Sequence, residues 1–441
     1  MFCTTMIQSV HQRPVRVVWK TATRVAVTTL LLSAPHVTFA QTTVDFEKPP
    51  VLKVTELVPA KLLTGQGFRV AEMVPTDGVM GTYTIDADRQ TFGNDAGTYY
   101  VRSRELLEIR LAEIPAIIKL DETSKTETFA KGMVTAAAQP LESAGQMIMN
   151  PIDTVTGLPS GVGRLFDRID LGATSLWGAA TNSNESGLER TKNVADQAGS
   201  ITMDALGYEK ARRELAKKLG VDPYTTNPIL AKKLDQIARI SFYGRLGVNT
   251  AISVAVPASM IITGVRVTDN LVWDTPRGDL IVRVNTKLEE LQVPKKQIHA
   301  FMHNHAIPLS LQVAVVENLS RLSGVSGRGN VAVLMGQVAT ESQARFLATS
   351  LRMLAEYHEQ QKPLTAIGAP GPLVARNQDG AIIMPAPVDY LSWTEKVAAF
   401  ATSPAFLSVP QRTLWLAGKM SPRAKEGFTA NGWTIQESAQ P

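Results

Sequence analysis

The stretch RTLWLAGKMSPRAKEGFTANGWTI, from Arg412 to Ile435, decides the fold class. It opens with an apolar run that is typical of a buried strand. Ser421 then provides a helix N-cap, and Pro422 fits the first helical turn, where its missing N–H costs little. Asn431 and Gly432 form a turn signal before a second apolar run. The order strand, helix, strand predicts a sheet covered by helices.

An upstream segment, NVAVLMGQVATESQARFLATSLRML from Asn330 to Leu354, has a similar pattern. We predict a strand that ends near Gly336, followed by a helix in which Thr340 and Gln343 match a capping box. The similarity is typical either of an internal duplication or of a strand–helix pattern that arose twice. Neither turn carries a phosphate-binding fingerprint such as GxGxxG or GxxxxGK[ST].

The residues between these two segments add a hairpin and a helix. Asp379-Gly380 inside VARNQDGAIIM is a two-residue hairpin signal. VDYLSWTEKVAAFA then predicts a helix, with Asp389 as its N-cap.

Working outward, the whole chain is predicted to be α+β, with a small β-rich N-terminal module, a helical middle and a C-terminal α/β layer domain. The predicted divisions are a signal peptide over 1–40, a β-rich module with a helix over 41–130, an Ala/Gly/Pro-rich helical or linker region over 131–205, a helical domain over 206–330 and an α/β domain over 331–441.

The predictions of the N-terminal module and of the helical middle rest on local sequence patterns. FRVAEMV and GTYTIDA are rich in β-branched and aromatic residues, so they predict strands. A helix follows, capped by Ser103, with an apolar face formed by Leu107, Leu111 and Ile114. Further along, a helix ends at Gly220, and Asn227 caps the next one.

The first 40 residues predict export. They contain four basic residues and no acid, and an uncharged apolar stretch runs to Ala40. This pattern is typical of a secretory signal cleaved after Ala40, although a retained anchor or an amphipathic N-terminus would share it. The only cysteine, Cys3, lies in this segment. The mature chain would therefore have no disulfide and no thiol nucleophile.

Charge argues against nucleic acid as a partner. The full chain has 45 basic and 40 acidic residues; removing the four basic residues of 1–40 leaves 41 against 40. A nearly neutral mature chain lacks the basic field that grips a phosphate backbone, so we predict no nucleic-acid partner.

Two weakly charged regions suit contact with another molecule. We predict that 131–180 contacts a protein partner or a membrane surface, although helices packed through small residues, or a linker, would have the same composition. Residues 246–265 carry no charge. Their length permits a membrane crossing, but their polar content favours a buried helix or strand pair.

The sharpest chemical feature is QIHAFMHNHAIPLS, which holds His299, His303 and His305. The first two are four residues apart, on one face of a helix, and the third could complete a zinc site with an open position. There is no HExxH motif and no acid between Glu290 and Glu317. The alternative interpretation is a helix end whose apolar residues face the core and whose imidazoles lie beside them.

These observations favour an exported, periplasmic or extracellular, envelope-associated binding or scaffold protein without catalytic activity or cofactor. One alternative is a metal-dependent hydrolase that holds zinc through the histidine cluster. A second alternative is a membrane-anchored envelope component.

Overall fold

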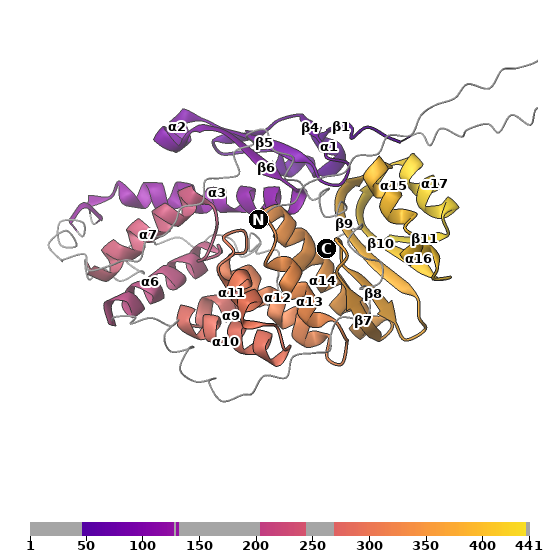
Figure 1. Cartoon of the computed structure of the whole chain (residues 1–441). Helices are drawn as coiled ribbons and strands as arrows, with labels where there is room; N and C mark the ends of the chain where they lie inside the picture. Colours follow the sequence, from indigo (N-terminus) through magenta and orange to yellow (C-terminus); the bar gives the residue numbers. More distant parts are fainter. Residues whose placement is uncertain (1–45, 128, 132–202, 244–268, 438–441) are drawn as a thin grey trace, which may run out of the picture. The chain divides into compact units, whose positions relative to one another are not determined.

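The computed structural model describes residues 46–127, 129–131, 203–243 and 269–437. The predicted signal peptide (1–40), nearly all of the predicted partner region (131–180) and the uncharged segment 246–265 lie outside the described residues. Within the described part, helices combine with small N-terminal sheets and a C-terminal sheet, so the α+β prediction is confirmed (Figure 1).

Short antiparallel strands build the N-terminal module. The strands are β1 (Val51–Lys53), β2 (Thr64–Gly65), β3 (Phe68–Val70), β4 (Met73–Pro75), β5 (Thr82–Ala87) and β6 (Gly97–Arg102). β1 pairs with β4, and the other four form a sheet in the order β2-β3-β5-β6. Tyr83 and Ile85 alternate along β5 with less buried neighbours, as a strand with one face in the core requires. Short helices α1 (Val54–Leu57) and α2 (Arg89–Phe92) complete the module.

Helix α3 (Arg104–Ser124) follows β6 directly. The hydroxyl of Ser103 accepts a hydrogen bond from the backbone N–H of Leu106 at 3.3 Å, so the predicted cap is confirmed. The predicted apolar face is confirmed as well, because Leu107, Leu111 and Ile114 are buried against the strands.

The far end of α3 packs on a helical hairpin made of α6 (Met203–Leu219) and α7 (Pro228–Tyr243). Gly220 ends α6 with a φ of 65°, which glycine adopts without strain. The side chain of Asn227 accepts from two backbone N–H groups at the start of α7. Both predicted helix boundaries are therefore confirmed.

Six further helices among the described residues precede the C-terminal sheet. They are α9 (Asp269–Asp274), α10 (Arg277–Glu290), α11 (Lys295–Met302), α12 (Leu309–Arg321), α13 (Arg328–Met335) and α14 (Glu341–Gln360). The predicted strand ending near Gly336 is wrong, because those residues form α13. Val331, Ala332 and Met335 are fully buried on this helix, and a short apolar run buried on all sides fits a helix as well as a strand. An internal duplication of a strand–helix unit would need that strand, so the structure does not support the duplication.

The C-terminal sheet has five strands in the order β11-β10-β9-β8-β7. Its strands are β7 (Leu364–Gly368), β8 (Val374–Asn377), β9 (Ile382–Leu391), β10 (Arg412–Met420) and β11 (Trp433–Glu437). β9, β10 and β11 run parallel, whereas β7, β8 and β9 pair antiparallel. The predicted Asp379-Gly380 hairpin is confirmed between β8 and β9, and Gly380 has a φ of 81°.

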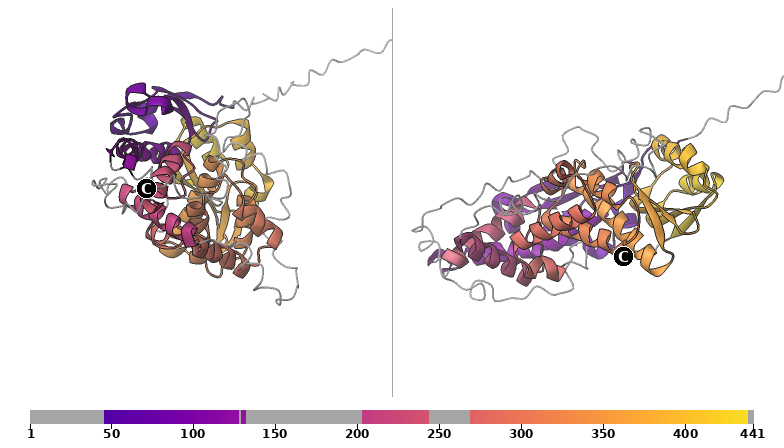
Figure 2. Two further views of the ribbon diagram at one scale, coloured as in Figure 1. Left: turned by 90° about the vertical axis from the view of Figure 1, so that its left-hand side faces the viewer. Right: turned by 60° about the horizontal axis from the view of Figure 1, so that its bottom comes forward.

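Helices cover this sheet on both faces (Figures 1 and 2). Helix α14 packs on β9 from one side, and α15 (Glu395–Ala401), α16 (Pro404–Leu407) and α17 (Pro422–Ala430) lie on the other. Phe400, Phe428 and Trp433 make ring contacts beneath the second group. Ser421 caps α17 as predicted, because its hydroxyl accepts from the Ala424 N–H at 2.9 Å.

The predicted cap at Asp389 is wrong. β9 continues through Asp389 to Leu391, and α15 begins later, capped by Thr394. The carboxylate of Asp389 instead accepts the backbone N–H of Arg104, the first residue of α3. Asp389 therefore serves the N-terminus of a helix that precedes it by 285 residues.

No helix among the described residues is both long enough and apolar enough to cross a membrane.

Candidate ligand-binding pocket

A pocket of about 490 Å³ lies where three parts of the chain meet. β6 and the first turns of α3 form one side, and the loop His303–Ala306 forms another. Thr226 and the start of α14 complete the lining. The volume lies within the range of sites that hold a small molecule, roughly 300–1,000 Å³.

Basic groups outnumber acidic ones in the described lining. Arg102 comes from β6 and Arg110 from α3, and His303 and His305 come from the loop, whereas Glu341 is the one acid. Neutral polar groups add donors and acceptors from Tyr100, Thr226, Asn304 and Thr340. Such a lining suits a ligand with a negatively charged group.

The structure brings two of the three predicted metal ligands into this pocket. His303 and His305 line it, whereas His299 lies one turn back on α11. The rings of His299 and His303 stack, with centroids 4.0 Å apart and planes 18° from parallel. The Nδ1 atom of His303 also lies 3.0 Å from the carbonyl oxygen of His299.

This stacking bears on the zinc prediction. The nitrogen lone pairs of imidazole lie in the ring plane, so two stacked rings direct them along parallel lines, whereas a tetrahedral ion needs them to converge. Among the residues that the structure describes, no three His, Cys, Asp or Glu side chains form a group that could hold a metal ion. The zinc site stays a prediction, and the described geometry gives it no coordination sphere.

The alternative interpretation of the histidine segment finds direct support. Ile298, Phe301 and Ile307 are buried in the main core, as a helix end facing that core predicts. Asn304 fixes the loop: its amide group lies 2.9 Å from the carbonyl oxygen of Val338, and its carbonyl accepts from Ala306 N–H at 2.9 Å. Asn304 thus joins the histidine loop to the residues before α14, across the pocket.

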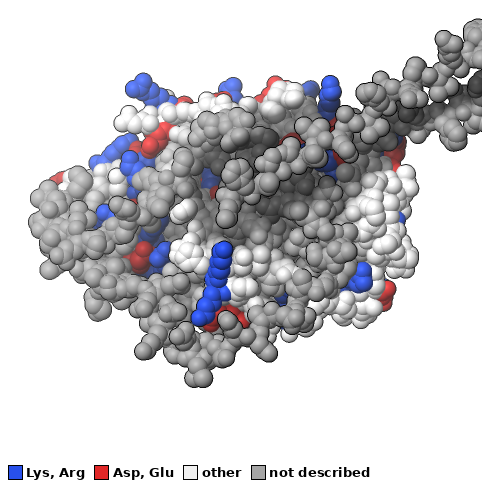
Figure 3. All heavy atoms as spheres, viewed as in Figure 1, with Lys and Arg blue, Asp and Glu red and all other residues white. Residues whose placement is uncertain are grey.

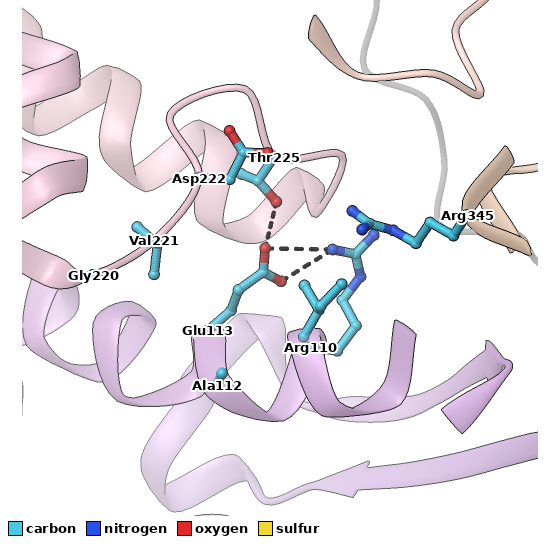
Figure 4. Close-up of a pocket in the computed structure, with 9 residues that line it drawn as sticks. Arg110, Ala112, Glu113, Gly220, Val221, Asp222, Thr225 and Arg345 are labelled. Carbon is cyan, nitrogen blue, oxygen red and sulfur yellow. Dashed lines mark hydrogen bonds and ion pairs between the residues drawn. The ribbon is translucent and has the colours of Figure 1, made fainter. Parts of the chain in front are cut away.

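Beneath the pocket lies a network of buried charges. Arg110 donates to both oxygens of Glu113, at 3.1 and 3.3 Å, and to Thr226 at 2.6 Å. Its other partner is Glu341, at 2.8 Å. Figure 4 shows the side chains of Arg110 and Glu113 together on α3, with Thr225 above them and Arg345 extending from the opposite side.

Glu341 has arginines on two sides. Its Oε1 atom lies 2.8 Å from the guanidinium of Arg345, and the hydroxyl of Thr226 donates to Oε2, the oxygen that Arg110 contacts. The side chains of Glu341 and Arg345 are 9% and 8% exposed. These contacts fix the orientation of Arg110 at the pocket lining, because each of its partners is held by a different element.

The protonation states follow from these pairs. Burial acts to raise the pKa of Glu341, but Arg110 and Arg345 outweigh it, so the pKa lies below its usual value. Burial acts to lower the pKa of Arg110, but Glu113 and Glu341 raise it above its usual value. Arg110 and Glu341 are therefore both charged at neutral pH.

Two neighbouring carboxyl groups behave differently. Burial raises the pKa of Glu105, although Arg345 opposes the shift. Burial also raises the pKa of Asp222, although the Ser310 hydroxyl and a backbone N–H oppose it. These two groups retain a proton more readily than Glu341 does, so of the three carboxyl groups Glu341 holds its negative charge most firmly.

The sequence reasoning missed this network. Two features of the sequence belong to this network: Arg110 and Glu113 are three residues apart on one helix, and Glu341 and Arg345 are four residues apart on another. The same spacings occur in ordinary surface ion pairs, so the sequence alone does not indicate burial. The contact that joins the two pairs spans 231 residues.

The pocket therefore offers a fixed guanidinium, imidazoles and hydroxyl groups around a space of small-molecule size. It can bind and orient a polar ligand with a negative charge. Comparison with known proteins found no matching family model, no matching curated protein and no matching solved structure.

Proposed function

We propose that this chain is an exported, envelope-associated binding protein that recognises a small anionic ligand without transforming it. The observation that carries the proposal is the pocket itself, in which Arg102, Arg110, His303 and His305 surround a space of about 490 Å³. Export follows from the predicted signal over residues 1–40 and is part of the proposal.

Preorganisation supports a binding role. Arg110 is held by two carboxylates and a hydroxyl, so an incoming anion would meet a cation whose side chain is already ordered. Less conformational entropy is then lost on binding. Because the charges of Glu113 and Glu341 offset that of Arg110, the other polar groups of the lining, among them Arg102 and the exposed His303, would contribute to the attraction.

The engaged side chains favour binding over catalysis. Glu341 is held by Arg345 as well as Arg110, and Thr340 accepts the N–H of Gln343 as a helix cap. Neither is poised as a base or a nucleophile, which needs a hydrogen-bonded partner ready to take or give a proton. On the face shown in Figure 3, basic and acidic side chains are interspersed over the described surface. This distribution suits a small ligand better than a polyanion.

The proposal is tested by thermal unfolding of the mature chain with inorganic phosphate, succinate or uncharged glycerol at constant ionic strength. We expect a Tm increase of roughly 2 °C or more with at least one of the two anions and none with glycerol. Arg102→Gln should abolish the increase. Arg69→Gln is the matched control, because Arg69 is exposed on β3 of the same sheet and does not line the pocket.

Three results would overturn the proposal. The first is no increase with either anion, and the second is an equal increase in the Arg102→Gln variant. The third is stoichiometric zinc in the purified chain that is lost in His303→Ala, which would favour the metal-dependent hydrolase instead.

A further inference from the structure

A second polar site lies at the carboxyl ends of the parallel strands β9 and β10. β9 ends at Leu391 and β10 at Met420, and the residues just after them approach each other. The backbone N–H of Ser421 donates to the carbonyl oxygen of Leu391 at 2.9 Å, which joins the two strand ends. In parallel sheets this edge is the usual place for ligands, and helix N-termini there favour anions.

A carboxylate from the same chain occupies this edge. One oxygen of Glu47 accepts the backbone N–H of Trp393 at 2.5 Å and the hydroxyl of Ser421 at 2.5 Å. The backbone N–H of Glu47 donates to the carbonyl oxygen of Trp393 at 2.9 Å. The two residues that hold the Glu47 side chain follow it by 346 and 374 residues.

The donors are preset for a carboxylate. Ser421 is 2% exposed, and its oxygen already accepts the N–H of Ala424 as the cap of α17. Its hydroxyl hydrogen is therefore directed outward, and accepting that N–H strengthens its donation to an anion. The N-terminal end of α17, a helix of nine residues, adds a favourable dipole.

The same edge contains an unused polar group. Ser392 precedes Trp393 and is 1% exposed, and its hydroxyl oxygen has no hydrogen-bond partner among the residues that the structure describes. A buried hydroxyl without a partner is uncommon, because it loses its bonds to water without replacement. Ser392 directly precedes Trp393, whose backbone N–H holds Glu47.

We propose that the carboxyl edge of β9 and β10 is a carboxylate-binding site and that Glu47 is its internal occupant. The ligand class is a small carboxylate, which would bind the Trp393 N–H and the Ser421 hydroxyl when the Glu47 side chain does not occupy them. This site shares no residue with the pocket around Arg110, so either one can fail without the other.

The test is chemical rescue in the full mature chain. Glu47→Ala should lower Tm, and sodium acetate should then raise it by roughly 2 °C or more over sodium chloride at equal ionic strength. The wild-type chain should show no acetate-specific increase, because its own carboxylate fills the site. Glu56→Ala is the matched control: Glu56 is exposed nearby, and its side chain accepts only the local N–H of Lys53 at 3.1 Å among the described contacts.

An absent acetate effect in Glu47→Ala, or an equal effect in Glu56→Ala, would overturn the proposal. If Glu47→Ala does not fold, the near-isosteric Glu47→Gln keeps the test open through hydrogen exchange at the Trp393 amide. We expect that amide to exchange at least severalfold faster than in the wild-type chain, because a neutral acceptor holds it less firmly than a carboxylate. Equal protection of this amide in both proteins would contradict the site.

Discussion

Two carboxylates, those of Glu341 and Asp389, are both buried, yet their environments are opposite. Glu341 lies between the guanidinium groups of Arg110 and Arg345, and its pKa is lowered. Within the described part of the chain, the donors to Asp389 are neutral: the backbone N–H groups of Gly81 and Arg104 and the hydroxyl of Tyr83.

The pKa of Asp389 consequently rises to about 7, because burial outweighs its hydrogen bonds. The comparison shows that full arginine charges compensate for the lost hydration of a buried carboxylate and that neutral donors compensate only in part. The two regions also differ in use: the arginine pairs order the pocket lining, whereas Asp389 joins the N-terminal module to the C-terminal sheet.

The largest expected effect comes from removing one arginine of the first region. Arg345→Met should lower the free energy of unfolding by about 4 kcal/mol, because it removes one of the two guanidinium groups that compensate the buried carboxylate of Glu341. Urea denaturation at neutral pH measures the change. A loss below about 1 kcal/mol would mean that the pair does not compensate for burial as described.

The second effect concerns Asp389 and pH. The pKa of an Asp side chain in an unfolded chain is about 3.9, whereas the pKa of Asp389 in the folded chain is about 7. Between these values the folded state holds the extra proton, so the group's contribution to stability is full below about pH 4 and is lost as pH rises through about 7. From pH 5 to pH 8 the wild-type chain should lose about 2.5 kcal/mol more than Asp389→Asn.

Urea denaturation of both proteins at several pH values measures this difference, and the other titrating groups cancel in the comparison. Parallel curves for the two proteins would show that Asp389 is ionised in the folded chain throughout, as Glu341 is.

The smallest effect tests whether burial is what distinguishes these sites. Lys217 on α6 lies 2.6 Å from Asp274 on α9, but the two side chains are 46% and 59% exposed. Water screens such a pair, so Lys217→Ala should change the free energy of unfolding by at most about 0.5 kcal/mol. A loss above about 1 kcal/mol in the same urea assay would remove the contrast with Arg345.

Local signals made part of the fold predictable. The caps at Ser103, Asn227 and Ser421 and the turn at Gly380 depend on residues within four positions of each other, and the structure confirms all of them. The α13 segment failed because a short apolar run buried on all sides does not distinguish helix from strand.

The long-range features were beyond the sequence for a different reason. The partners of Asp389 precede it by about 300 residues, whereas an acidic side chain shortly before a helix indicates a local cap in the sequence. The histidine segment, which the sequence predicts as a candidate site, forms one side of the pocket. Arg110 and Glu341 meet there only through the packing of α3 against α14. No pattern in either helix indicates that contact.

Calorimetric titration of residues 41–441 with inorganic phosphate, at constant ionic strength, tests the pocket most directly. We predict one saturable site per chain in the wild-type and Arg69→Gln proteins, and an affinity at least tenfold weaker in Arg102→Gln. A flat titration of the wild-type protein, or equal affinity in both arginine variants, would contradict the assignment of this pocket as an anion-binding site.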